Sequence, residues 1–450
     1  MGTYVAALDF GSSKVTLAVG EKTDAGVRIV ACYDAPATGI ECGEITNEFK
    51  VSETVRGLVA RAEEDLGVKV GEVTVGVSCR TIHARALSRT VRRRDAASSI
   101  GMDEILRITR DVYREESDGG EAVFEAVPQH YSTEDRIGIG QEELVGMSGA
   151  LIEADFKVFG GKWPVIDRRR AVLEKCGLKM RKAVLAATAS ARAVLSSREM
   201  ENGAALVDIG KGLTQVAVVR DNVLRHVAVI PFGGESVTVD IKNETGVTRH
   251  WAETVKVLHG RCCEEYAVEN RKLVLKDENG VNEGEVEIML LTRIIEARMS
   301  EILDAVRYVI EQSGYAGKIP AGVVITGGCS HMDNILQLAE ALLGRRVRLA
   351  APQGAITGDS AEEAFDVYSS TAVGLVLETL DPRLSHVLEQ DAEPEANPEK
   401  KPETAPPPAV DPPKKRGLFG GGRKGGRKTD DDGQLDLFHQ IFAVSNDDKA

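Results

Sequence analysis

The chain has 450 residues, 42% hydrophobic and 28% charged, which is enough for two or more soluble domains with buried cores. Its formal net charge of −14 argues against a nucleic-acid partner, which would require a basic face. Seven cysteines, at 32, 42, 79, 176, 262, 263 and 329, include no Cys-x-x-Cys pair, and this favours free thiols in a reducing cytosol over disulfides or a zinc site.

The first residues enter a strand pattern, YVAAL, with no basic and then apolar leader before it, so we expect no signal peptide. No apolar run approaches the ~18 residues of a membrane-spanning helix. Strand and helix patterns alternate to about residue 385, which predicts an α/β fold. We expect any membrane contact to be peripheral and on the cytosolic side.

A weak internal repeat lies in the folded part. Residues 5–20 read VAALDFGSSKVTLAVG, and residues 205–220 read ALVDIGKGLTQVAVVR. Both segments have an apolar strand, an Asp-x-Gly, a short polar turn and a second apolar strand. Two such segments half a chain apart favour a duplicated domain with a symmetric cleft. The alternative is a pair of unrelated hairpins with ordinary turn chemistry.

The two hairpins carry residue types that bind phosphate and magnesium. Asp9 and Asp208 would place carboxylates at the mouths of the two sheets, where Mg²⁺ could be held through its waters. Glycine lets the backbone approach a phosphate closely, turn N–H groups form an anion nest, and lysine adds positive charge. The candidate phosphate ligands are Gly11, Ser12, Ser13 and Lys14 in the first hairpin and Gly210, Lys211, Gly212 and Thr214 in the second.

Two later segments could hold a base and a ribose. A predicted strand over 323–326 ends in Gly327 and Gly328, which would turn the chain toward a helix near Met332. A flat base could lie against such a turn. Glu253 and Lys256, three residues apart on one helical face, could clamp the ribose and adenine, or could form an ordinary surface ion pair.

The order of the two hairpins, the Glu/Lys helix and the Gly-Gly turn resembles that of the actin, Hsp70 and sugar-kinase superfamily. The segment DIGKGLTQVAVVRDNVLRHVAVIPFGGESVT is similar to the corresponding stretch of actin. By this resemblance Gln215 takes the place of a histidine near the hydrolytic water. Gly233 and Gly234 take the place of the glycine turn after the third strand.

A more specific resemblance, over residues 1 to about 383, is to FtsA, the bacterial actin-like cell-division family. The segments that carry it are ALDFGSSKVTLAV, VPQHYSTEDRIGIGQEELVGMSGALIEADFKVF, KCGLKMRKAVLAATASARAVL, LVDIGKGLTQVAVV, LRHVAVIPFGGESVTVDI, AETVKVLHG and VVITGG. The second of these segments is similar to a subdomain that FtsA inserts into its first half. The arginine run at 92–94 is expected on a solvated face of this insert.

The resemblance implies a duplicated actin-like ATPase fold with a C-terminal tail. Its first-half subdomain would comprise 1–83, 166–200 and 359–385, with the SHS2-like insert at 84–165. The second half would comprise 201–245 and 307–358, with a small subdomain at 246–306. A disordered linker, acidic and Pro-rich and then basic and Gly-rich, would span 386–434, followed by an amphipathic membrane-targeting helix at 435–444.

The implied function is in bacterial cell division. Such a protein binds ATP and Mg²⁺, self-associates, and anchors FtsZ filaments of the Z-ring to the inner membrane at the septum. The FtsZ C-terminal peptide would dock on 246–306, and later division proteins would also bind. The family's second hairpin reads DIGGGTTD, whereas this chain has Lys211 and Gln215 in place of a glycine and the aspartate. Gln215 can orient a water but cannot act as a base, so at most weak ATPase activity is expected.

The tail ends in an apolar cluster, with Leu435, Leu437, Phe438, Ile441 and Phe442 on one half of a helical wheel. By resemblance this cluster is the membrane-targeting helix, and the basic linker before it would favour an anionic leaflet. The alternative is a disordered end with chance periodicity, because ten residues form a marginal helix.

Three other classes of function share the fold. A pilus-assembly adaptor would not need the membrane tail. A sugar-kinase-type phosphotransferase would need a catalytic aspartate in a substrate pocket, for which no motif is found. An Hsp70-type chaperone would need a β-sandwich after residue 385, where the chain is short and Pro-rich.

Overall fold

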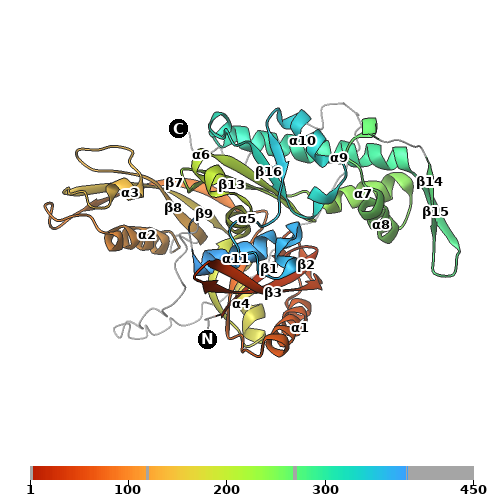
Figure 1. Ribbon diagram of the computed structural model, residues 1–450, viewed down its shortest axis with the longest axis horizontal. Coiled ribbons are helices and arrows are strands. Elements are labelled where there is room, and N and C mark those ends of the chain that lie inside the picture. The colour runs from red at the N-terminus through yellow and green to blue at the C-terminus, as the bar shows by residue number, and fades with distance from the viewer. Residues whose placement is uncertain (1–3, 118–120, 267–270, 382, 384–450) are drawn as a thin grey trace, which may run out of the picture. The chain divides into compact units, whose positions relative to one another are not determined.

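Two five-stranded sheets of the same topology form the core of the computed structural model, which describes residues 4–117, 121–266, 271–381 and 383 (Figure 1). The first sheet has the order β10 (Lys179–Leu185), β6 (Glu72–Val77), β1 (Tyr4–Phe10), β2 (Lys14–Thr23) and β3 (Gly26–Pro36). In the corresponding direction, the second has the order β17 (Val347–Leu349), β16 (Val323–Thr326), β11 (Ala204–Ile209), β12 (Thr214–Arg220) and β13 (Val223–Ile230). The predicted α/β class and duplication are confirmed.

The registers of the two central hairpins match as well. β1 pairs antiparallel with β2 and parallel with β6, and β11 pairs antiparallel with β12 and parallel with β16. Asp9 therefore faces Thr16 across its hairpin, as Asp208 faces Gln215. All six residues of β11 are buried, as expected for a strand covered on both faces.

Two helices pack against each other between the sheets, α5 (Ala186–Val194) and α11 (Ser370–Leu380) (Figure 1). α11 contacts β1, β2 and β6, whereas α5 contacts β11 and β12. The crossing is close because Gly374 lacks a side chain, and a Cβ there would lie 1.8 Å from the carbonyl oxygen of Ala189. Small residues and aliphatic side chains thus form the joint between the halves, in keeping with the scarcity of aromatic residues.

Further helices cover the outer faces of both sheets. In the first half these are α1 (Glu48–Leu66), which begins where the Asn47 side chain accepts from the Lys50 N–H, and α4 (Pro164–Lys175). In the second half they are α9 (Ile288–Gln312) and α10 (Ile335–Leu343). The shorter elements are β4 (Ile40–Glu41), β5 (Glu44–Ile45), α6 (Ser197–Asn202), and the 3-10 helices η1 (Glu264–Tyr266), η2 (Ala316–Lys318), η3 (Gly328–His331), η4 (Glu362–Phe365) and η5 (Val367–Ser369).

A separate small sheet with its own core is formed by the part of the chain that follows β6 and precedes α4. It has the order β7 (His83–Arg92), β9 (Leu151–Gly161), β8 (Ala122–Ser132), with α2 (Met102–Ser117) packed on β8 and α3 (Gln141–Leu144) nearby. Ile105, Tyr131 and Phe156 are among its buried residues. These elements occupy the predicted insert, although β7 begins one residue before 84 and α4 begins at 164.

The arginine run on this insert differs from the expectation of a solvated face. Arg92 and Arg94 are exposed, but only 4% of the Arg93 side chain is accessible. Its guanidinium donates to both Glu104 carboxylate oxygens, at 3.1 and 3.2 Å, and to the carbonyl oxygens of Ser98 and Gly149. Arg93 turns inward because these acceptors satisfy its donors, so only its two neighbours face solvent.

The small part of the second half consists of α7 (Gly234–Thr245), α8 (Arg249–His259) and the hairpin of β14 (Lys272–Lys276) and β15 (Asn282–Glu287). Here α9 runs without a break past the predicted boundary at residue 306, because its buried face continues to Ile310. Within the described ranges, no helix is both long and apolar enough to cross a membrane. The predicted linker at 386–434 and helix at 435–444 lie outside the described residues.

Candidate functional site

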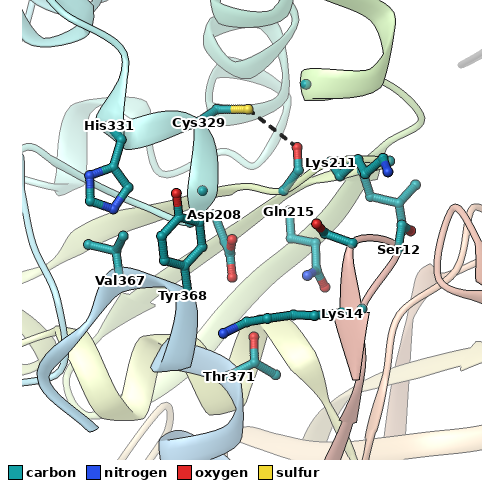
Figure 2. A pocket seen from close by; sticks show the side chains of 18 of the residues that line it. Ser12, Lys14, Asp208, Lys211, Gln215, Cys329, His331, Val367, Tyr368 and Thr371 are labelled. Atoms are coloured by element: carbon teal, nitrogen blue, oxygen red, sulfur yellow. Dashed lines mark hydrogen bonds between the residues drawn. The ribbon is translucent and has the colours of Figure 1, made fainter. Parts of the chain in front are cut away.

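A pocket of about 290 Å³ lies where the two Asp-x-Gly hairpins meet (Figure 2). Every predicted site residue of the folded part lines it except Thr214 and Gly233: it is lined by Asp9, Gly11, Ser12, Ser13, Lys14, Asp208, Gly210, Lys211, Gly212, Gln215, Gly234, Glu253, Lys256, Gly327 and Gly328. The buried Thr214 hydroxyl instead donates to the carbonyl of Phe232, at 2.9 Å. A Cβ on Gly233 would lie 2.3 Å from the Gly210 carbonyl oxygen, so Gly233 packs behind the second hairpin.

The two hairpins approach each other closely at one edge of the pocket. A Cβ on Gly212 would lie only 2.8 Å from the Ser12 hydroxyl oxygen. That hydroxyl accepts from the Gly43 N–H, at 3.1 Å, which adds the turn between β4 and β5 to the same wall. A larger residue at 212 would push the halves apart, so the closed pocket depends on this glycine.

Two buried carboxylates belong to the pocket. Asp208 accepts from the Ser190 hydroxyl at 2.9 Å, and burial raises its pKa although the hydroxyls of Ser190 and Thr371 oppose the rise. Burial, together with the charge of Asp208, raises the pKa of Asp9 to about 7. Because like charges repel strongly in a buried site, a cation bound near both carboxylates would stabilise them. The described residues contain no cluster of three or more acidic, histidine or cysteine ligands.

Three lysines reach the pocket in different states. Lys14 pairs with Asp34 and lies 5.3 Å from the centre of the Tyr368 ring. Lys211 lies 3.9 Å from a Glu235 carboxylate oxygen. Both are about one-third exposed or less and can reorient toward an anion.

Lys256 is held more firmly. It donates to the Gly234 carbonyl, the Thr238 hydroxyl and the Glu253 carboxylate, at 2.9, 2.7 and 2.8 Å. Glu253 and Lys256 therefore form the ion pair that was one of the two predicted alternatives. Both residues also line the pocket, and the Lys256 side chain is buried. The pair can orient a ligand while each partner stabilises the other.

Gln215 lies beside Asp208 in the pocket (Figure 2). Its buried Oε1 atom accepts no hydrogen bond from any described residue. A buried amide oxygen is costly to leave unpaired, so a water or a ligand donor is expected to fill this position. The group can orient a water molecule but cannot take its proton.

Sequence reasoning missed the aromatic side of the pocket. The rings of His331 and Tyr368 stack with centroids 4.9 Å apart and planes tilted by 24° (Figure 2). Gly328 lies against Tyr368, where a Cβ would come within 2.8 Å of the ring. Gly327 has φ +87° and would bring a Cβ 2.4 Å from an Asp208 oxygen, so only glycine fits there.

The segment after this turn also differs from the expectation. A 3-10 helix follows it, and α10 begins at Ile335 instead of near Met332, because Asn334 adopts a left-handed conformation with φ 65°. The described pocket also includes Gly43, Ser78, Cys329 and Thr371, which belong to no recognisable motif. Only their place in the folded chain identifies them.

The chain resembles known cell-division proteins in sequence. A family model described as "Cell division protein FtsA" matches residues 205–374. The Cell division protein FtsA of Neisseria meningitidis serogroup B is 29% identical over 376 residues, covering 83% of this chain and 89% of that protein. The Pseudomonas aeruginosa and Escherichia coli K12 proteins of the same name are each 28% identical, over 84% and 83% of this chain and 89% of their own length. The resemblance to FtsA is confirmed.

Solved structures share the fold at much lower identity. A PilM–PilN type IV pilus biogenesis complex matches with a TM-score of 0.61 and 16% identity, over 84% of this chain and 99% of that chain. MreB5 of Spiroplasma citri, bound to ADP, matches with a TM-score of 0.50 and 13% identity, over 83% and 95% of the two chains. These matches confirm the predicted actin-like fold and, at this identity, carry nothing on function.

Proposed function

We propose that this chain, a relative of the FtsA cell-division proteins, binds ATP and Mg²⁺, self-associates, and anchors FtsZ filaments to the cytoplasmic face of the cell membrane at the division septum. The observation that carries the proposal is the sequence relation to proteins of that name over more than four-fifths of the chain. The likeness to a pilus complex is one of fold and does not favour a pilus-assembly adaptor.

The pocket supports the nucleotide part of this proposal. The backbone of Gly11, Ser12 and Ser13 on one side, and of Gly210 and Gly212 on the other, would hold phosphates, with Lys14 and Lys211 as counter-charges. The ribose and base would lie along Gly327 and Gly328, beside Glu253 and Lys256. Asp9 and Asp208 fit Mg²⁺ because they are hard oxygen ligands whose mutual repulsion a divalent cation would relieve.

The residues at the second hairpin support slow turnover. The side chain next to the buried carboxylates is an amide, Gln215, which can position water but leaves it without a base. The nucleotide would then act mainly as a conformational ligand. Phosphate release by the purified chain is expected to be slow, and fast release would contradict this assignment.

Membrane attachment is assigned to the tail on its sequence pattern. Leu435, Leu437, Phe438, Ile441 and Phe442 lie outside the described residues, and the proposal for them depends on amphipathic spacing and on the resemblance to FtsA. A single short helix of this kind binds weakly, so several copies on a self-associated chain would attach by avidity. We expect the full chain to sediment with anionic liposomes, and a chain ending at residue 434 to remain in solution.

A control for liposome binding is available on the same helix. A double substitution of apolar residues, Phe438→Asp with Phe442→Asp, should abolish sedimentation. The substitution His439→Ser on the polar side should change it little. Equal loss in both variants, or none in either, would contradict an amphipathic anchor.

The partner test is a pull-down with the FtsZ C-terminal peptide. We place its docking site on residues 246–306, which include α8 and the hairpin of β14 and β15. The peptide is expected to retain the chain, whereas the same peptide in scrambled order should not. Failure of the peptide to retain the chain at high micromolar concentration would overturn the FtsZ assignment. Later division proteins are further expected partners, and nucleic acid is not.

A further inference from the structure

One arginine is buried beneath the pocket, in α4, the helix that follows the last strand of the insert. Arg169 is 1% exposed and has the largest fully buried side chain of the described residues. Its guanidinium donates to four carbonyl oxygens: those of Gly76 (3.0 Å), Val165 (2.8 Å), Gly43 (2.8 Å) and Ser78 (3.4 Å). None of these four acceptors carries a charge.

Two of the acceptors belong to the pocket wall. Gly43, between β4 and β5, and Ser78, after β6, both line the pocket. Gly43 has φ 72°, and a Cβ there would lie 2.5 Å from the Ser78 carbonyl oxygen, so the two turns touch. The Gly43 carbonyl accepts from Arg169 while its N–H donates to the Ser12 hydroxyl of the first phosphate hairpin. A continuous path of hydrogen bonds thus joins Arg169 to Ser12.

The charge of this arginine also acts on the pocket. A buried cation carries a desolvation cost of several kcal/mol, and an apolar side chain would fill the same space with less cost. Burial lowers the pKa of Arg169, and the negative charge of Asp9 opposes that shift. The Arg169 charge in turn favours the ionised form of Asp9, against the effect of Asp208. The buried charge is therefore matched to the pocket and is not explained by packing alone.

We propose that Arg169 is a positioning residue of the nucleotide site. It holds the turns at Gly43 and Ser78 against the first phosphate hairpin, and its positive charge offsets the buried carboxylate of Asp9. The proposal rests on the assignment of the pocket to a nucleotide. Because α4 directly follows β9, Arg169 also fixes the base of the insert to the pocket wall.

The test compares substitutions at two neighbouring arginines in the full chain. Arg169→Met keeps an apolar side chain close in size to the aliphatic stem but removes the charge and the donors. Arg169→Lys keeps the charge but cannot bridge four carbonyls. Arg170→Met is the matched control, since Arg170 lies next in the same helix with 42% of its side chain exposed. The readouts are the dissociation constant for ATP with Mg²⁺ and the hydrogen exchange of residues 39–47.

We expect Arg169→Met to weaken ATP binding at least tenfold, which is about 1.4 kcal/mol and close to one net hydrogen bond. Exchange at residues 39–47 should rise in the same variant. Arg169→Lys should recover part of the affinity, while Arg170→Met should stay within twofold of the unaltered chain in both readouts. Binding within twofold in a folded Arg169→Met variant, or equal loss in the Met and Lys variants, would overturn the proposal.

The test still decides the question if the unaltered chain does not bind ATP or if the Arg169→Met variant does not fold. If the unaltered chain does not bind ATP, the proposed function fails, while exchange at residues 39–47 still reports whether Arg169 holds the wall. If Arg169→Met does not fold, Arg169→Lys carries the comparison. It should then show at least threefold weaker binding at an unchanged melting temperature, and unchanged affinity would overturn the proposal.

Discussion

Glu125 offers a quantitative test of how the insert is joined to the rest of the chain. This residue of β8 is fully buried, and its two carboxylate oxygens accept from the Leu185 N–H at 2.9 Å and from the Thr188 hydroxyl at 3.0 Å. Burial raises the pKa of Glu125 from its ordinary 4.5 to about 8, against those two hydrogen bonds. The buried carboxylate of Glu378 adds to the rise.

The sign of the pH dependence follows from this shift. Between pH 4.5 and 8 the folded chain keeps a proton on Glu125 that the unfolded chain has lost, so its contribution to stability is complete below 4.5 and disappears as the pH approaches 8. At about 1.4 kcal/mol per pH unit, the whole range corresponds to an upper limit of about 5 kcal/mol. Glu125→Gln has nearly the same shape and does not titrate.

We therefore expect the Glu125→Gln variant to gain stability relative to the unaltered chain as the pH rises from 5 to 8, by on the order of 2–4 kcal/mol. Urea unfolding followed by circular dichroism at several pH values would measure the difference in the free energy of unfolding. Glu142→Gln, at an exposed position of α3, is the control and should show no such trend. A difference that stays constant between pH 5 and 8 would refute the reasoning.

Three substitutions test the helix crossing between the two halves and the close approach and charges of the pocket. Gly374→Ala should lower the free energy of unfolding by about 3 kcal/mol, because the added Cβ would overlap the facing helix. The control is Gly57→Ala, in open space on α1, which should raise the free energy of unfolding by about 0.5–1 kcal/mol. Urea unfolding measures both changes. Asp208→Asn should raise the melting temperature without nucleotide, by removing one of two repelling carboxylates, and should abolish the extra stabilisation by ATP and Mg²⁺; retained stabilisation would exclude the residue from the site. Gly212→Val should weaken ATP binding at least tenfold at near-normal stability, since its side chain would collide with Ser12, and unchanged affinity would show that the halves need not close.

The sequence was sufficient for the features that depend on local pattern. Alternating apolar residues around each Asp-x-Gly predicted both hairpins, and the matching topology of the two sheets places Asp9 and Asp208 at equivalent ends of their central strands. The residues that lie far from these motifs could not be found in this way. His331 and Tyr368 stack only after two separate segments meet, and neither segment has a pattern that predicts the contact.

Buried charge was the second limit of sequence reasoning. An arginine is expected to be exposed, because burying it is costly. The side chains of Arg93 and Arg169 are both buried, and each donates to backbone carbonyl groups distant in sequence: Arg93 to Gly149, and Arg169 to Gly43 and Gly76. Such acceptors are backbone atoms and leave no signature in the residue types. The compensation is visible only in three dimensions.

One short helix links the insert to the pocket between the two Asp-x-Gly hairpins. In α5, Thr188 donates to Glu125 of the insert, and two residues later Ser190 donates to Asp208 of the pocket. A ligand that changes the position or ionisation of Asp208 acts on the same helical turn that donates to Glu125. By thermodynamic reciprocity, any partner that binds the insert more tightly in the presence of nucleotide must raise the affinity for nucleotide by the same factor. Glu125→Gln keeps the fold but weakens one end of this link, so the coupling factor between a partner of the insert and ATP should fall toward one while each ligand still binds alone.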